Sequence, residues 1–229
     1  MPVEAAMIFA AGFGTRMRDL TKDMPKPMLP VAGRPMIDHA LDHVFAAGIS
    51  QAVVNTHYLA PVIEAHLKGR PNVTTLREEP DVLETGGGLR NALPQLGSGP
   101  VVTMNPDAIF IGPNPVEFLL SSQAGNAATL LLLPRHKALS HGGRGDFDMD
   151  ASRTLSWRDG EAADYIYTGV QLIDPKGLQE IPEKKFSLRL LWEKYMEDDD
   201  VKGVVYPGSW IDVGTPEGLA SADAELARQ

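Results

Sequence analysis

Hydrophobic and polar positions follow two different periods in the first half of the chain. Short, continuous apolar runs are typical of strands that are buried on both faces, whereas apolar positions three and four residues apart are typical of helices packed on one face. The segment "PMIDHALDHVFAAG" has the helical spacing, a proline suited to the first turn and a glycine suited to the C-terminal cap. On this basis, we expect strands at residues 3–9, 51–56, 73–76 and 100–105, and helices at residues 35–48, 59–67 and 85–96.

These strands and helices alternate along the sequence. Such alternation is typical of a parallel sheet with helices on both faces and right-handed crossovers. The predicted fold class is therefore α/β.

The pattern changes after residue 134. The segment "PRHKALSHGGRGDFDMD" is polar and rich in glycine, which predicts a loop that leads into a short strand. No stretch is rich enough in Gly, Ser or Pro to separate two domains, so residues 1–229 are expected to form one domain with an inserted substrate-binding half. The elements expected in this half are short strands within 151–173 around a turn at Asp159–Gly160, helices at 187–196 and 215–228, and a strand at 202–208.

Composition narrows the classes of partner. The chain is 43% hydrophobic, which is enough for a substantial core, and its formal net charge is −9. An acidic protein repels nucleic acid and anionic membranes, so we expect neither as a partner. The absence of cysteine excludes disulfides and thiolate chemistry and is compatible with the cytoplasm, the expected location. No apolar run approaches the roughly 20 residues that span a bilayer, and no secretory signal is expected.

A glycine-rich loop, "AAGFGTRM", follows the first predicted strand. Gly12 and Gly14 allow backbone N–H groups to turn toward an anion, and Arg16 can bind phosphate oxygens with two hydrogen bonds. Lys26, held extended between prolines in "MPKPMLP", supplies a second cation. The spacing matches neither the dinucleotide pattern Gly-x-Gly-x-x-Gly nor a P-loop. The alternative is a glycine turn beside basic surface residues.

Two aspartates stand where predicted strands end. Asp107 follows the apolar run at 101–104, and Asp212 precedes a glycine turn in "GSWIDVGTPEGL". The C-terminal ends of parallel strands are where α/β sheets bind ligands. Mg²⁺ favours one or two carboxylates together with phosphate oxygens, so the two aspartates could share one ion. A single aspartate before a turn is more often a cap, but two beside an anion-binding loop favour a metal.

Two further motifs suggest contacts with a substrate. In "ETGGG", no packing reason is evident for three glycines, so residues 86–88 could leave room for a flat base, and Glu79 or Glu84 could accept the N–H of a pyrimidine. In "GGRGDF", Gly145 could donate its N–H to a sugar hydroxyl, and Asp146 could accept from one. The alternatives are solvated glutamates and loop glycines for the first motif, and a flexible lid or hairpin turn for the second.

Taken together, these motifs resemble a known family. "AAGFGTRM…KPMLPVAGRPMI" resembles the signature of the sugar-phosphate nucleotidyltransferases, and "ETGGG", "GRGDF" and "WIDVGTPEGL" most resemble the N-acetylmuramate α-1-phosphate uridylyltransferase branch. The resemblance extends from Ala6 to about Leu219. It implies a Rossmann-like core with a mixed, mostly parallel central sheet and helices on both faces. It also implies a nucleotide-binding half, about 1–134, and a sugar-binding half, about 135–229.

The motifs and the resemblance together give a set of candidate site residues. The resemblance matches Asp107 and Asp212 to the Mg²⁺ aspartates of the family. The candidate catalytic residues are Arg16, Lys26, Asp107 and Asp212. The candidate nucleotide-binding residues are Ala11, Gly12, Gly14, Thr15, Glu79, Gly86, Gly87 and Asn105. The candidate sugar-binding residues are Gly145, Asp146 and Gly169.

The chain departs from the family pattern in two places. Many relatives have Asn-Gly-Asp where this chain has Asn-Pro-Asp, and Pro106 has no N–H to offer a ligand. Thymidylyltransferase relatives carry Glu-Lys-Pro before the sugar strand, but the corresponding segment here is "SWRDGEAADY". The sugar phosphate could instead contact Arg18, Arg144 or Arg158, or the metal alone.

The function expected from the sequence is transfer of a uridylyl group from UTP to a sugar-1-phosphate, with N-acetylmuramic acid 1-phosphate as the preferred acceptor and Mg²⁺ as cofactor. The resemblance suggests peptidoglycan recycling as the setting, and a monomer or small homo-oligomer. The alternatives are GTP with mannose-1-phosphate, dTTP with glucose-1-phosphate, CTP with phosphocholine, or a nucleotide-sugar-binding protein without turnover. A dinucleotide-dependent oxidoreductase would fit the alternation, but the chain lacks its fingerprint.

Overall fold

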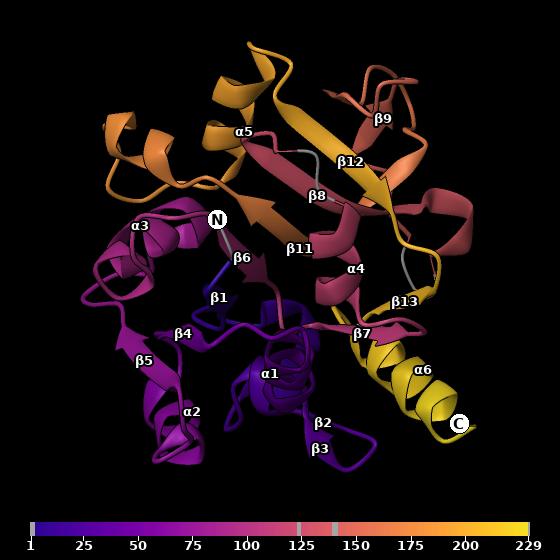
Figure 1. The fold of residues 1–229 in the computed structure, drawn as a ribbon. Coiled ribbons are helices and arrows are strands. Elements are labelled where there is room, and N and C mark those ends of the chain that lie inside the picture. The colour runs from indigo at the N-terminus through magenta and orange to yellow at the C-terminus, as the bar shows by residue number, and fades with distance from the viewer. Residues whose placement is uncertain (1–2, 123–124, 139–141, 229) are drawn as a thin grey trace.

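The computed structural model describes residues 3–122, 125–138 and 142–228 (Figure 1). Within these residues, nine strands form one mixed sheet in the order β10-β9-β11-β6-β1-β4-β5, with β8 paired to β11 and β12 paired to β8. These strands are β1 (Ala5–Phe9), β4 (Gln51–Thr56), β5 (Val73–Arg77), β6 (Val101–Met104), β8 (Ala128–Pro134), β9 (Phe147–Met149), β10 (Leu155–Trp157), β11 (Tyr165–Ile173) and β12 (Val201–Val205).

The N-terminal part of the sheet is parallel. β1 pairs in parallel with both β4 and β6, and β4 pairs in parallel with β5. β11 then runs antiparallel to β6, β8 and β9, which makes the sheet mixed. Each strand and helix predicted before residue 105 is present, with ends shifted by a residue or two. The predicted α/β fold class with a mixed sheet is therefore confirmed.

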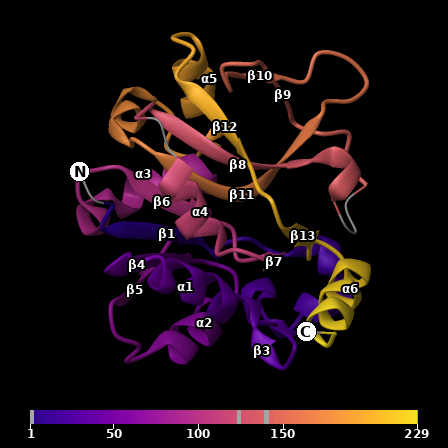
Figure 2. The same cartoon turned by 45° about the vertical axis from the view of Figure 1, so that its right-hand side comes forward.

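Helices cover both faces of the sheet. Figure 2 shows α3 (Glu84–Leu96) on the opposite side of β1 from α1 (Met36–Ala46) and α2 (Ala60–Leu67). α4 (Pro115–Ser122) lies on the α1 side, whereas α5 (Arg189–Met196) packs on the α3 side.

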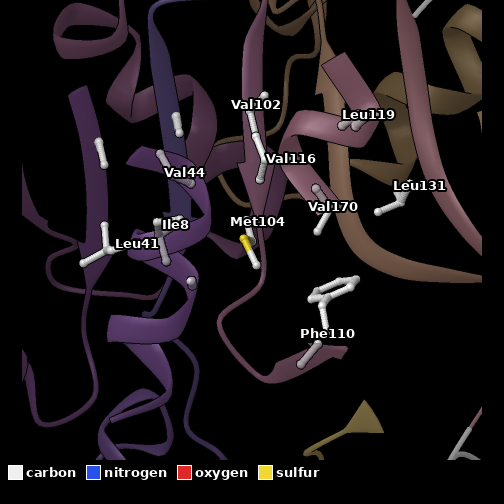
Figure 3. Packing of buried hydrophobic residues seen from close by; sticks show 14 of the residues in the cluster. Ile8, Leu41, Val44, Val102, Met104, Phe110, Val116, Leu119, Leu131 and Val170 are labelled. Atoms are coloured by element: carbon white, nitrogen blue, oxygen red, sulfur yellow. The ribbon is translucent and has the colours of Figure 1, made fainter. Parts of the chain in front are cut away.

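The core on the α1 side follows from the helical periodicity of the sequence. The buried positions of α1 recur at three- and four-residue spacing, which places one apolar stripe against the sheet. Figure 3 shows Leu41 and Val44 of this stripe near Ile8 of β1, with Met104 and Val116 farther along the same cluster.

A second, smaller layer lies at the C-terminal end of the main sheet. β7 (Ala108–Ile111) pairs antiparallel with β13 (Ser209–Asp212), and β2 (Pro30–Val31) pairs with β3 (Arg34–Pro35). The terminal helix α6 (Pro216–Leu226) begins as predicted at the N-cap Thr215, whose Oγ1 accepts from the N–H of Gly218 at 3.3 Å. A separate apolar cluster holds this layer together: Met17, Leu29, Val31, Met36, Ile109, Ile211, Val213 and Ala222.

Several elements were not predicted. They are the short strands β2, β3, β7 and β13, the helix α4, the strand β8, and the 3-10 turns η1 (Thr15–Thr21), η2 (Lys26–Met28), η3 (Arg135–Lys137) and η4 (Lys176–Glu180). Residues 139–141 of the predicted polar loop lie outside the described residues. Strands from before and after residue 134 pair in the same sheet, because β11 lies between β6 and β8. Among the described residues, no helix combines the length and apolar composition needed to cross a membrane.

Candidate active site

A cavity of about 480 Å³ opens at the C-terminal ends of β1, β4 and β6. This is the edge where α/β sheets bind ligands, and the volume is in the range of small-molecule sites. The predicted site residues that line it are Ala11, Gly12, Gly14, Thr15, Arg16, Lys26, Asn105 and Asp107. The sequence therefore identified most of the loop side of this cavity.

The glycine loop turns where its sequence requires it. Gly14 has a φ of 64°, in the left-handed region that favours glycine. A Cβ at this position would stand 3.0 Å from both the Cβ of Lys26 and the Cγ2 of Thr21. The Thr21 hydroxyl donates to the carbonyl of Gly14 at 3.1 Å and holds the turn. The loop is thus packed directly against the segment that carries Lys26.

The four candidate catalytic residues form two pairs of opposite charge. Lys26 Nζ lies 2.6 Å from Asp107 Oδ2, and these side chains are 11% and 31% exposed. Arg16 Nη1 lies 4.0 Å from Asp212 Oδ2, with exposures of 64% and 16%. The structure therefore places a cation beside each aspartate; Lys26, Asp107 and Arg16 line the cavity, whereas Asp212 lies behind Arg16 and does not line it.

The two aspartates are brought together by the β7–β13 ladder. Asp212 pairs with Ala108 in register, and the N–H of Val213 donates to the carbonyl of Asp107 at 2.9 Å. Gly214 lines the cavity next to this ladder, and a Cβ there would lie 2.8 Å from Asp212 Oδ1. Residues from the middle of the chain and from near its C-terminus thus converge on one edge of the site.

Asp107 and Asp212 are the carboxylates here that could hold a magnesium ion together with a substrate. Within the described part of the chain, no three His, Cys, Asp or Glu side chains are grouped so that they could hold a metal. A magnesium ion bound here would take these two carboxylates, and its remaining ligands would be phosphate oxygens and water. That is the usual arrangement for Mg²⁺ at phosphate-transfer sites.

The three glycines of α3 have packing roles, contrary to the expectation from sequence. A Cβ on Gly86 would stand 2.4 Å from the ring of Phe186, and one on Gly87 would stand 2.5 Å from the carbonyl oxygen of Lys184. A Cβ on Gly88 would stand 2.7 Å from Glu78 Oε1. The expectation that no packing reason requires these glycines is therefore wrong.

The N–H groups of the first two glycines are also occupied. Gly86 and Gly87 donate to the carbonyl of Phe186 at 2.9 and 3.1 Å. Glu84 and Thr85, the two residues just before these glycines, line the cavity, and their N–H groups have no hydrogen-bond partner among the described residues. Glu84 has a φ of 61°, an uncommon conformation for a residue with a side chain. The N–H groups available at the cavity are thus those of Glu84 and Thr85 and not those of Gly86 and Gly87.

The structure does not bring Glu79 to the cavity. Its side chain is 71% exposed and lies 3.7 Å from Arg77 Nη1. The neighbouring Glu78 is 1% exposed and faces inward. Of the two glutamates considered from sequence, only Glu84 lines the cavity.

The sugar-side candidates lie around β9 and β11. A Cβ on Gly145 would stand 2.4 Å from the carbonyl oxygen of Ala163, so this position is tightly packed. Asp146 Oδ2 accepts from the N–H of Tyr167 at 2.9 Å, which gives its carboxylate a structural partner. Neither Gly145 nor Asp146 is among the residues that line the cavity.

Gly169 lies closer to the site. The N–H of Asn105 donates to the carbonyl of Gly169 at 2.9 Å. Gly169 has a φ of 88°, and a Cβ there would stand 3.0 Å from the Asn105 side chain. Gly169 therefore supports Asn105, which lines the cavity beside Pro106. Of the three arginines considered for the sugar phosphate, Arg158 donates from Nη1 to the carbonyl of Gly145 at 2.7 Å.

Sequence reasoning missed several residues of the site. Asn55, Val82, Thr85, Ser187 and Gly214 line the cavity in addition to the predicted set. Asn55 had a recognisable signal, because it is a polar residue near the end of an apolar strand pattern. The others depend on contacts between segments far apart in the sequence.

Comparison with known proteins identifies the family. Residues 6–142 match the family described as the MobA-like NTP transferase domain. The chain is 39% identical to the N-acetylmuramate alpha-1-phosphate uridylyltransferase of Caulobacter vibrioides, over 97% of this chain and 96% of the relative. It is 30% identical to the mannose-1-phosphate guanylyltransferase of Mycobacterium tuberculosis, over 97% of this chain and 64% of the relative.

A solved structure has the same fold. HddC from Yersinia pseudotuberculosis, complexed with GMP-PN, superposes with a TM-score of 0.77 and 23% identity, over 97% of this chain and 99% of that one. The resemblance noted in the motifs is confirmed by the family match and by the full-length relative. The chain therefore belongs to the MobA-like NTP transferases and is a nucleotidyltransferase.

Proposed function

We propose that this nucleotidyltransferase transfers a uridylyl group from UTP to a sugar-1-phosphate, and that N-acetylmuramic acid 1-phosphate is the preferred acceptor. The observation that carries the proposal is the convergence of Arg16, Lys26 and Asp107 beside a glycine loop at one cavity, with Asp212 paired to Arg16 and next to Gly214 at its edge. Two cations and two carboxylates provide both a binding site for a triphosphate and ligands for a divalent ion.

The chemistry needs little beyond positioning and charge neutralisation. An oxygen of the sugar phosphate attacks the α-phosphorus of the nucleotide, and pyrophosphate leaves. The nucleophile is already an anion at neutral pH, so no general base is required. Backbone N–H groups of residues 11–15 hold the triphosphate, while Lys26 and Arg16 screen its charge so that the second anion can approach. Mg²⁺, held by Asp107 and Asp212, would neutralise charge on the phosphate oxygens.

The preference for UTP rests on two supports. The uridylyltransferase of Caulobacter vibrioides matches this chain at 39% identity over almost its whole length, whereas the guanylyltransferase relative matches over 64% of its own length at 30%. In addition, Glu84 and Thr85 line the cavity with N–H groups that have no other hydrogen-bond partner in the described residues. These N–H groups could donate to a pyrimidine carbonyl, and a carboxylate or carbonyl there could accept the imide N–H.

GTP is the second candidate nucleotide, because the similar HddC structure contains GMP-PN.

CTP should be a poorer substrate than UTP. Cytosine lacks the imide N–H and would leave a buried acceptor unpaired, which costs about 1–3 kcal/mol of binding free energy. We therefore expect UTP to exceed CTP in kcat/KM by roughly tenfold to a hundredfold.

The decisive experiment measures pyrophosphate release with UTP, dTTP, CTP and GTP, each combined with N-acetylmuramic acid 1-phosphate, glucose-1-phosphate and mannose-1-phosphate. The proposal expects the highest kcat/KM for UTP with the first acceptor. Equal use of CTP, or a preference for GTP, would overturn the uridylyl assignment. Binding of nucleotide-sugars without turnover for any pair would instead indicate a non-catalytic binding protein.

A further inference from the structure

A buried chain of hydrogen bonds connects the glycine loop to the segment before α3. The N–H of Ala10 donates to Asn55 Oδ1 at 2.8 Å, and Asn55 Nδ2 donates to Glu78 Oε1 at 2.7 Å. The N–H of Leu83 donates to Glu78 Oε2 at 2.7 Å. Asn55 is 3% exposed and Glu78 is 1% exposed. Two side chains therefore link two backbone segments across the interior.

The two backbone N–H groups at the ends of this series of hydrogen bonds determine which group donates and which accepts in each bond. Both ends are backbone N–H groups, which can only donate. Asn55 must present its oxygen to Ala10, so its amide nitrogen must donate to Glu78. Glu78 must then accept at both oxygens, which only an ionised carboxylate does. A glutamine at position 78, or a protonated glutamate, would place its own N–H or O–H donor against the Asn55 amide or the Leu83 N–H, which are also donors.

The hydrogen-bond chain runs along one wall of the active-site cavity. Ala10 and Asn55 line the cavity at the glycine loop, and Val82 and Glu84 line it on either side of Leu83. The contact is close because Gly88 has no side chain, and a Cβ there would stand 2.7 Å from Glu78 Oε1 and 2.9 Å from Asn55 Nδ2. Gly88 thus leaves the space that the two side chains occupy.

We propose that Asn55 and Glu78 are positioning residues that set the spacing between the triphosphate loop and the wall that contacts the base. The proposal rests on the proposed function, in which residues 11–15 bind the triphosphate and the start of α3 faces the base. A ligand that touches both segments depends on their spacing, whereas a ligand that touches only one does not. A substitution that breaks these hydrogen bonds should therefore weaken the binding of a whole nucleotide much more than the binding of tripolyphosphate.

The test uses a pair of variants that reverse the polarity of the middle bond. Glu78→Gln alone places an amide donor against Asn55 Nδ2 or the Leu83 N–H, and Asn55→Asp alone places two carboxylates together. The double variant restores every bond: the aspartate introduced at position 55 accepts from Ala10 and from the glutamine at 78, whose oxygen accepts from Leu83. The net charge of the pair is unchanged.

We expect each single variant to weaken UTP binding and to raise the KM for UTP by roughly ten- to a hundredfold, which corresponds to one mismatched buried hydrogen bond. Binding of magnesium tripolyphosphate should change by less than about threefold, and the double variant should regain wild-type UTP affinity within the same factor. Glu117→Gln, an exposed site on α4, is the matched control for loss of a carboxylate and should bind UTP normally.

Three results would overturn the proposal. They are unchanged UTP affinity in both single variants, equal losses for UTP and tripolyphosphate, and a folded double variant that binds UTP no better than the single variants. If the single variants do not fold, the double variant alone decides, because it folds and binds UTP only if the polarity argument is right. Failure of the wild-type protein to bind any nucleoside triphosphate would instead refute the proposed function.

Discussion

Lys26 and Asp107 form an ion pair across 81 residues of sequence, with Nζ 2.6 Å from Oδ2. The lysine lies in a short turn that begins after Pro25, and only 9% of the residue is exposed. Its ammonium group therefore neutralises a carboxylate that we propose as a metal ligand. Both groups lie at the cavity, where a triphosphate would compete for the lysine.

Replacing Lys26 with methionine should affect the chemical step more than the binding of the acceptor. Lys26→Met keeps the apolar stem and removes the charge. A cation on the triphosphate becomes more important as negative charge moves to the leaving pyrophosphate. We expect kcat to fall by about 10²- to 10³-fold, the range seen when one stabilising group is removed from an active site. Steady-state kinetics against both substrates measures this effect.

The control for this variant is Lys22→Met, because Lys22 is exposed and is not among the residues lining the cavity. A loss confined to the affinity for the sugar phosphate would place Lys26 on the other substrate and contradict this prediction.

The two proposed metal ligands should differ in their effect on stability when no metal is present. Asp107→Asn leaves Lys26, whose side chain is 11% exposed, without its counter-ion, which should lower the free energy of unfolding by about 1–3 kcal/mol. Asp212→Asn leaves Arg16, which is 64% exposed and can be solvated, so we expect a loss below about 1 kcal/mol. Urea unfolding in EDTA compares them. Equal decreases in the free energy of unfolding of the two variants would show that the burial of the cation does not determine how much stability is lost.

Much of the sheet and the loop side of the site could be predicted from local sequence. The alternation of strands and helices up to residue 105 depends on short-range periodicity, which is visible in the chain itself. The glycine loop could be recognised because backbone N–H groups that face an anion require few side chains nearby. Arg16 and Lys26 follow from the same local pattern.

The rest of the site depends on partners distant in sequence. β7 and β13 are four-residue strands that hold each other in place, and neither pattern is distinctive alone. Gly86 and Gly87 of α3 could be explained only with Phe186 and Lys184, about 100 residues later, in contact with them. Glu78 and Glu79 look alike in sequence, but one is buried and the other exposed. Local chemistry identified the residue types, and only the tertiary contacts separated their roles.

Alanine at Gly87 should destabilise the protein even though alanine favours helices. In an open helix position, Gly→Ala would stabilise by up to about 1 kcal/mol. At Gly87 the new Cβ would stand 2.5 Å from the backbone carbonyl oxygen of Lys184, which cannot rotate away. We expect a net loss of about 1–3 kcal/mol in the free energy of unfolding. Gly99→Ala is the control, because a Cβ there meets no atom within 4 Å. Equal stability of the two variants would contradict the packing role.

His43 should make the protein less stable in mild acid. Burial is the main cause that lowers the pKa of His43 below its ordinary value of 6.5, and the nearby His39 lowers it further. The His43 ring packs edge-on against Phe110, with the ring centroids 6.0 Å apart. Below pH 6.5 the unfolded chain binds a proton at this position that the folded chain resists, so stability falls as the pH drops toward the folded-state pKa.

Urea unfolding between pH 5 and pH 7.5 measures this dependence. His43→Gln should reduce the slope of stability against pH by up to about 1.4 kcal/mol per pH unit, the value for one proton. His136→Gln, at an exposed position, is the control and should leave the slope nearly unchanged. A slope in His43→Gln identical to the wild type would assign the pH dependence to other groups.

Arg90 fastens the segment 181–188 to α3. Its Nη1 donates to the carbonyl of Ile181 at 2.5 Å, its Nη2 donates to the carbonyl of Glu183, and its guanidinium lies 4.7 Å from the ring centroid of Phe186. The same segment supplies the Phe186 carbonyl to the N–H groups of Gly86 and Gly87 and contributes Ser187 to the cavity. A substitution of Arg90 that loosens this segment should therefore disturb the proposed nucleotide site, although Arg90 itself does not line the cavity.

Arg90→Lys tests this connection, because it keeps the charge but cannot satisfy several carbonyls with one planar group. We expect trypsin to cleave faster after Lys184 and Lys185, by roughly tenfold for a loss of about 1.4 kcal/mol in local stability. UTP should slow this cleavage, because a ligand that binds the closed segment stabilises it. Arg153→Lys, whose arginine donates to the carbonyl of Ser122 at 3.4 Å, is the control. Mass spectrometry maps the cleavage sites. Cleavage of Arg90→Lys after Lys184 and Lys185 at the wild-type rate would show that Arg90 does not hold the segment 181–188 against α3.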